Sequence, residues 1–126
     1  MERRVCGAHI ELHPSYEAVL RVIPGNLPEA EPDEMHSALR CTLEAHAQGE
    51  HYSLARSLPT SHPAEVWACW ADGQQPSGVI TLPDCPAINP AHGDEACLLF
   101  NEHPGAHSWA LTDPEDDALR AHLGLL

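Results

Sequence analysis

The sequence predicts a small α+β domain with short antiparallel strands, one or two helices and a thin hydrophobic core. Three observations favour this fold class. The chain has 126 residues but only 5% aromatic residues, and it contains 12 Pro and 8 Gly, which limits any core. Its apolar residues fall in short alternating runs that are typical of strands. It also contains 5 Cys and 10 His, enough side chains for bound metal to replace part of a core.

The clearest strand signal is a hairpin near residues 65–82. Two apolar runs, 65–71 and 78–82, flank a turn-forming segment that contains Asp72 and Gly73. Further extended segments are predicted at 16–23, 51–58 and 107–111. These segments together predict a set of short antiparallel strands.

A C-terminal helix near residues 113–123 has the best-marked boundaries. Asp113 can act as the N-cap, Pro114 fits the first helical position, and Gly124 follows as a stop signal. A second helix is predicted over 33–49, where apolar residues recur at helical spacing before a Gly. Both helices are short, so they must pack on other elements to be stable.

The N-terminal segment and the charge of the chain define the expected compartment and partners. The chain has no apolar run of signal-peptide length and nothing near the ~20 apolar residues that span a bilayer. We therefore expect a cytoplasmic protein without membrane contact, in which Cys and His favour metal binding over disulfides. The net charge is −13 and all six basic residues are Arg. Nucleic acid is then an unfavoured partner, because binding it depends on cations that contact phosphates.

The clearest metal-site motif lies in the second half of the chain. Cys85, Cys97, His103 and His107 have the spacing Cys-x11-Cys-x5-His-x3-His, and four such ligands are what structural zinc requires. The segment 104–106 between the two His is Pro-Gly-Ala, which disfavours the continuous helix of a metalloprotease and offers no Glu as base. The motif therefore predicts a closed structural zinc site.

A second, less regular candidate site lies in the first half of the chain. Its predicted members are Cys6, Cys41 and His51, with His9 or His46 as the remaining ligand. Cys41 and His51 lie ten positions apart, as do the second Cys and last His of the later motif, and both last His residues follow a Gly by two positions. In an unbroken helix, Cys41 and His46 would lie about 140° apart around the axis, which favours His51. One Zn²⁺ is expected and a second is an alternative, so the single domain 1–126 could consist of two pseudo-repeats, 1–58 and 59–126.

These motifs resemble those of a group of small zinc-binding proteins of actinobacteria and their phages. That group carries Cys-Gly near a His-Pro, then Cys-x-Leu, then His-x-Gly-x-His followed by an aromatic residue. The matching segments here are 6–7 with 13–14, 41–43 and 49–52, and in the later copy 97–99 and 103–107. The first copy departs from the motif at Ala47. The resemblance implies a zinc-binding module and indicates no reaction.

The favoured function is that of a non-catalytic, zinc-stabilised adaptor or regulator with a protein partner. One alternative is a zinc-dependent hydrolase, in which the first site has three protein ligands and leaves a position for water, with Glu44 or Glu50 as base. Another is a nucleic-acid-binding protein, or an acidic mimic of nucleic acid. The spacing differs from that of a DNA-reading zinc finger, and the negative charge weighs further against DNA binding.

Overall fold

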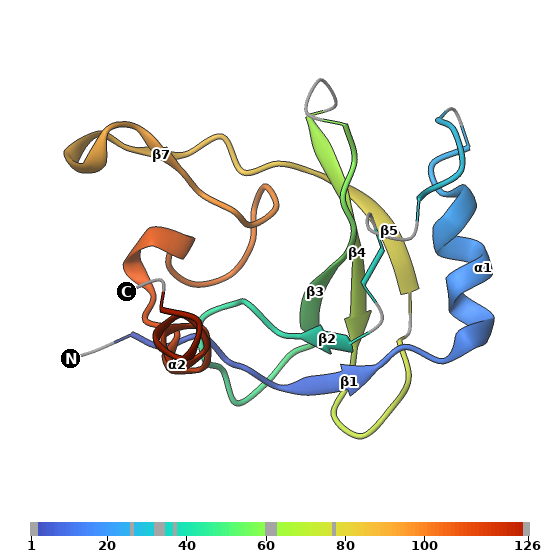
Figure 1. Ribbon diagram of the computed structural model, residues 1–126, viewed down its shortest axis with the longest axis horizontal. Coiled ribbons are helices and arrows are strands. Elements are labelled where there is room, and N and C mark those ends of the chain that lie inside the picture. Colours follow the sequence, from blue (N-terminus) through green and yellow to red (C-terminus); the bar gives the residue numbers. More distant parts are fainter. Residues whose placement is uncertain are drawn as a thin grey trace.

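Among the residues that the computed structural model describes, three short antiparallel sheets and two α-helices form an α+β fold (Figure 1). The structure describes residues 3–25, 27–31, 35–36, 38–59, 63–76 and 78–124, without the side chains of Glu17 and His92. In Figure 1, α1 lies on one side of the central strands, and the β7 segment and α2 lie on the other. No helix in the described ranges is long and apolar enough to cross a membrane.

The central sheet has the strand order β3-β4-β5, formed by His51–Arg56, Ala64–Trp70 and Gly78–Pro83. Strands β4 and β5 form the predicted hairpin, with Trp67 opposite Ile80 and a turn in which Gly73 has a φ of +73°. Trp67 and Trp70 are both buried, so the sheet contributes to the core from both faces.

Each of the other two sheets is a two-stranded ladder. Strands β1 (His9–Glu11) and β2 (Ala38–Arg40) form one ladder, and β6 (Ile88–Asn89) and β7 (Glu95–Ala96) form the other. The helix predicted over 33–49 is therefore wrong where the structure describes it. Leu39 is buried opposite Ile10, and pairing with β1 satisfies the backbone that a helix would have satisfied internally. The N-cap expected at Asp33 lies outside the described residues.

The segment predicted as a strand over 16–23 is instead the helix α1, Pro14–Val22. Pro14 stands near the helix start, and the His13 ring accepts a hydrogen bond from the Ser15 amide as a cap. Tyr16 and Leu20 are spaced for one helical face, and Leu20 is completely buried. The β-branched residues Val19 and Val22 lie on the exposed side of this helix. Their preference for strands is therefore outweighed by the packing of Leu20 in the core.

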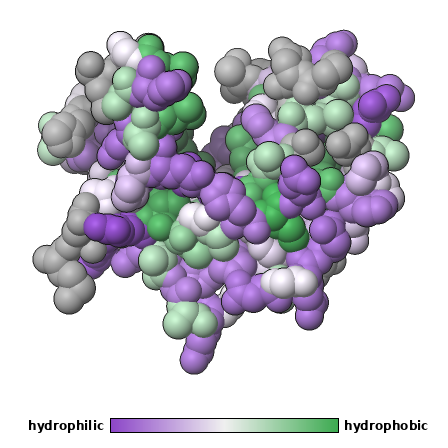
Figure 2. Space-filling model, turned by 60° about the horizontal axis from the view of Figure 1, so that its bottom comes forward, coloured by the Kyte–Doolittle hydropathy of each residue, from purple (hydrophilic) through white to green (hydrophobic). Residues whose placement is uncertain are grey.

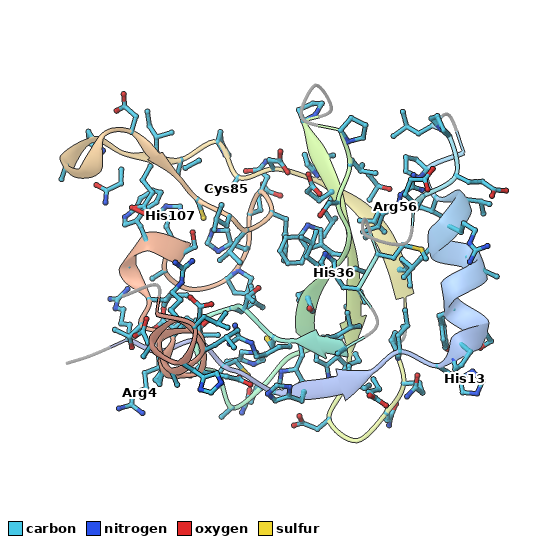
Figure 3. The ribbon with its side chains drawn as sticks, in the orientation of Figure 1. Arg4, His13, His36, Arg56, Cys85 and His107 are labelled. Carbon is cyan, nitrogen blue, oxygen red and sulfur yellow. The ribbon has the colours of Figure 1, made fainter. Side chains whose placement is uncertain are left out.

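Buried Arg56 attaches the C-terminal end of α1 to the sheet. Its guanidinium donates hydrogen bonds to carbonyls at the end of α1 and just beyond, namely those of Leu20, Arg21, Ile23 and Pro28. Figure 3 shows Arg56 between the central strands and α1. A helix end leaves carbonyls without intrahelical partners, and the two terminal nitrogens of the buried guanidinium donate to them.

The C-terminal helix α2, Pro114–His122, confirms the predicted helix and its N-cap. The Asp113 carboxylate accepts a hydrogen bond from the Asp116 amide. The strand predicted over 107–111 is wrong, because Ser108–Ala110 form a 3-10 turn, η3, in which the Ala110 amide donates to the His107 carbonyl. No described residue of α2 is buried, so this helix must be held by polar contacts.

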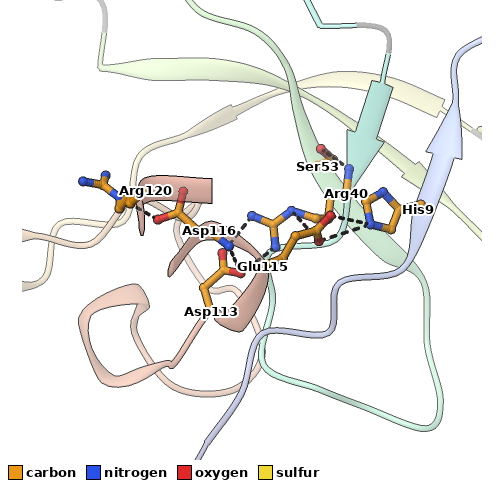
Figure 4. A network of polar contacts seen from close by, with 7 residues as sticks. All are labelled: His9, Arg40, Ser53, Asp113, Glu115, Asp116 and Arg120. Carbon is orange, nitrogen blue, oxygen red and sulfur yellow. Dashed lines mark hydrogen bonds and ion pairs between the residues drawn. The ribbon is translucent and has the colours of Figure 1, made fainter. Parts of the chain in front are cut away.

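A network of charged side chains attaches α2 to the β1–β2 ladder (Figure 4). Arg40 on β2 donates to both oxygens of Asp113, at 2.9 and 2.7 Å, and its Nε lies 3.5 Å from Glu115. His9 on β1 lies 3.1 Å from the same Glu115. The two-point Arg40–Asp113 contact fixes the start of the helix in orientation as well as in position.

Candidate metal centres

Among the described residues, two groups of Cys and His side chains converge, and either could hold a metal ion. In each group the four ligand atoms all lie within 4.8 Å of one another. The first group consists of Cys6, Cys41, His46 and His51, and the second of Cys85, Cys97, His103 and His107. Four Cys and His ligands at such separations are the donor set of structural zinc.

The second group brings together all four residues of the clearest sequence motif. Cys85 Sγ lies 3.7 Å from His107 Nδ1, and Cys97 Sγ lies 3.5 Å from His103 Nε2. In a tetrahedral zinc site, sulfur and nitrogen ligands are about 3.5 Å apart, given the usual bond lengths. The observed separations therefore fit Zn²⁺. Figure 3 shows Cys85 and His107 side by side at the edge of the β7 segment.

In the first group, the structure brings His46, and not His9, together with Cys6, Cys41 and His51. Cys6 Sγ lies 3.4 Å from His51 Nδ1, and Cys41 Sγ lies 3.7 Å from His46 Nε2. His9 lies outside the group, because its exposed ring faces Glu115 on α2. His46 reaches Cys41 because the chain leaves β2 as a loop, where the sequence had predicted a helix.

The two groups share the same main-chain frame. In both, the amide of the first Cys donates to the carbonyl two residues beyond the second Cys, at 2.7 and 3.0 Å. The amide of the second Cys donates in turn to the carbonyl two residues beyond the first, at 2.8 and 3.1 Å. The residue before the first Cys forms a β-bridge with the third residue after the second Cys in both groups. In both, a two-stranded ladder begins where the third residue after the first Cys pairs with the residue just before the second Cys. The segments in this frame are 4–9 with 40–45, and 83–88 with 96–101.

The histidine rings also follow one scheme. In both groups the earlier His presents Nε2 to a thiol and the later His presents Nδ1. On their outer side, His46 Nδ1 donates to the Gln48 carbonyl at 2.8 Å and His103 Nδ1 to the Pro104 carbonyl at 3.1 Å. Such outer hydrogen bonds fix the ring orientation and leave the other nitrogen deprotonated for a metal.

The ring of buried His51 is oriented by a carboxylate. Its Nε2 contacts the Asp72 carboxylate, while its Nδ1 faces Cys6. Nothing in the sequence marks Asp72 as a partner of His51, because the contact depends on the register that places His51 opposite Trp70 beside the hairpin turn. Metal-binding His residues often donate to a carboxylate in this way, which makes the ring a stronger ligand.

The loops that carry the His pairs differ by one residue in two places. The second group has one more residue between its Cys and first His, and one fewer between its two His residues. The left-handed residue Glu102, at a φ of +65°, lies within the longer stretch, and Gly49 and Gly105 have positive φ in both loops. Because the first loop is one residue shorter before its first His and one residue longer after it, His46 reaches the group and Ala47 occupies the position where the motif has His.

The electrostatic setting of the thiols favours a bound cation. The pKa of Cys41 is raised to about 11, mainly by burial and in smaller part by neighbouring Cys6, against the lowering effect of hydrogen bonds with the Tyr52 and Leu43 backbone. Burial likewise raises the pKa of Cys85, beside Cys97. Neighbouring thiols of which at least one is buried resist ionisation, whereas a divalent cation stabilises both thiolates. Metal binding is thus expected to release protons.

A carboxylate connects the two groups. Glu44, in the loop between Cys41 and His46, accepts a hydrogen bond from the Ala106 amide at 2.8 Å. Ala106 lies between the two His of the second group, and a Cβ on neighbouring Gly105 would meet Glu44 Cβ at 2.8 Å. The sequence offered no signal for this contact, since it joins residues 62 positions apart.

The chain matches no protein family, no curated protein and no solved structure. The motif resemblance to small actinobacterial zinc-binding proteins therefore identifies no family, and the metal assignment rests on the geometry of the two groups.

Proposed function

We propose that the protein is a non-catalytic, zinc-stabilised adaptor or regulator that acts through contacts with another protein, with one Zn²⁺ in each group. The observation that carries the proposal is that each group offers four Cys and His ligand atoms within 4.8 Å of one another. Four protein ligands complete the tetrahedral coordination of zinc and leave no position for a reacting water. Zinc in such a site is a scaffold.

The position of the thiols in the core supports a structural role for the metal. Cys41, Cys85 and Cys97 are buried in the same cluster as the apolar core residues. The ladders beside them are short, at three and two residues per strand, and cannot hold these segments alone. Because the site forms only in the folded chain, the free energy of metal binding contributes to folding.

The hydrolase alternative is less well supported. It requires three protein ligands in the first group and a free carboxylate as base, but His46 offers a fourth ligand. Glu44, one of the two candidate bases, already accepts the Ala106 amide. The net charge of −13 continues to weigh against nucleic-acid binding.

Metal content tests the proposal directly. Protein purified without chelator is expected to contain two zinc ions per chain by mass spectrometry. Cys41→Ser and Cys97→Ser should each lose one zinc, whereas Cys69→Ser, which lies outside both groups, should retain both. Substitution by Co²⁺ should give the absorption of tetrahedral sites with two thiolates each. Less than one zinc per chain, or octahedral Co²⁺ spectra, would contradict the proposal.

A further inference from the structure

An apolar groove runs between the second metal group and the central sheet. Two adjoining hollows, of about 490 and 510 Å³, share the same apolar lining. The shared residues are Leu54, Trp67, Leu98 and Leu99. Figure 2 shows the molecule hollowed between two lobes, with hydrophobic side chains toward the floor of the hollow.

The wall of the groove is built by the second metal group. Leu98 follows directly after Cys97, and its side chain is exposed, with 78% of the residue accessible. Its amide donates to Ser108 Oγ at 2.8 Å, and the Ser108 amide in turn points at Cys97 Sγ, 3.4 Å away. These hydrogen bonds fix the backbone of Leu98 within the loop of the second group, so that its exposed side chain can contact a partner.

The polar rim of the groove is acidic at both ends. Glu65 and Asp84 line one hollow, and Asp116 and Asp117 line the other. No basic side chain lines either hollow in the ranges that the structure describes. Several of these carboxylates have partners within the protein, but the chain as a whole carries a charge of −13, which favours a cationic partner.

We propose that this groove binds an extended segment of a partner protein that carries an apolar side chain flanked by Arg or Lys. The apolar anchor would pack on Leu98 and the floor beside Trp67, and the flanking cations would meet the acidic ends. The inference rests on the proposed function, because zinc in the second group holds the wall that carries Leu98.

A labelled peptide tests the groove. The probe is a fluorescein-labelled octapeptide with two central Leu, two Arg on each side and Gly at both ends, titrated with the zinc-loaded protein in fluorescence anisotropy. Saturable binding that weakens as salt is raised is expected, because exposed charges are screened. Replacing the Leu pair of the peptide by Ser, or its Arg by Glu, should each weaken binding about tenfold or more.

Matched variants locate the binding site. Leu98→Ser should weaken binding at least about fivefold, whereas Leu119→Ser, an exposed Leu on α2 outside the groove, should change it by less than about twofold. Asp117→Asn should weaken binding about twofold at low salt, whereas Asp94→Asn, an exposed carboxylate outside the groove, should not. All four positions are exposed, so the variants should fold.

Three outcomes would overturn the inference: no saturable binding up to about 1 mM protein, equal binding of the acidic peptide, or equal losses in Leu98→Ser and Leu119→Ser. Zinc content separates this failure from failure of the proposed function. Protein with two zinc ions that ignores the peptide refutes the groove and leaves the metal scaffold standing. Protein that lacks zinc and still binds the peptide through Leu98 refutes the scaffold instead.

Discussion

Single residues outside the two Cys/His groups contact both of them, and Asp72 is the clearest case. Its side chain is 88% exposed, yet from the β4–β5 turn its carboxylate contacts the ring of buried His51. An exposed carboxylate contributes little to folding by itself. Its effect is instead on His51, because it determines which nitrogen carries the proton.

Removing this carboxylate should weaken metal binding at the first group. Asp72→Asn is expected to lower zinc affinity there about tenfold or more, as for other outer-sphere carboxylates, with little change in the folded structure. Competition with a chromophoric chelator would measure it. Asp94→Asn serves as the control, and equal affinities in both variants would contradict the role given to Asp72.

The contact between Glu44 and Ala106 should make the two groups depend on each other. Glu44→Ala removes an acceptor from the loop between His103 and His107 and is expected to lower zinc affinity at the second group about fivefold. Glu44→Gln keeps an amide oxygen and should retain most of the affinity. Stepwise calorimetric titration of zinc measures both variants, and unchanged second-group affinity in Glu44→Ala would rule out the coupling.

At the scale of elements, charge docks α2. Burial alone would raise the pKa of Asp113, but its hydrogen bonds with Arg40 and with helix amides lower the pKa below its ordinary value. A lowered pKa means that the pair stabilises the fold fully above the ordinary carboxyl pKa. The stabilisation is lost as the pH falls through the lower folded value, that is, below about pH 4.

Asp113→Asn isolates this charge effect, because Asn is an equally good N-cap. The variant is expected to melt roughly 3 °C below the wild type, for a loss of about 1 kcal/mol. Because the pair stays ionised, the difference should be constant between pH 5.5 and pH 8. Thermal melts of both zinc-loaded proteins check this, and a gap that closes as the pH rises would contradict the assignment.

Sequence patterns predicted those elements whose signals are local. The α2 helix has its cap, its Pro and its stop within the segment, and the β4–β5 hairpin has its turn between its two strands. The error at α1 arose because Val19 and Val22 look like strand residues, although both lie on the exposed side of a helix. The signal that could have corrected it is the spacing of Tyr16 and Leu20 after Pro14.

Long-range pairing explains the remaining errors. Strand β2 forms because β1, about 30 residues earlier in the chain, supplies its hydrogen bonds. The residues 38–40 themselves contain no pattern that predicts this pairing. The four residues of the second group could be proposed together from the sequence because they lie within one short stretch, 85–107. In the first group the helix expected around Cys41 favoured His51 over His46, and that helix is absent from the described residues 38–49, where His46 approaches Cys41 from a loop.

For the whole molecule, removal of metal should cost much of the fold. Excess EDTA is expected to lower the melting temperature by more than about 10 °C and to reduce the cooperativity of the transition, because both ladders are anchored at ligand cysteines. Circular dichroism during thermal denaturation measures this, and added zinc should restore the transition. A melt that is unchanged by EDTA would show that the core is stable without metal.

The shared frame of the two groups also implies an order of assembly. Its two Cys lie 12 residues apart in the second group but 35 apart in the first. Bringing the ends of the longer segment together costs about 1 kcal/mol more in chain entropy. The second frame should therefore close first during folding and take up the first equivalent of zinc. The folded second frame would then offer the Ala106 amide to Glu44, and the longer first segment would fold against it afterwards.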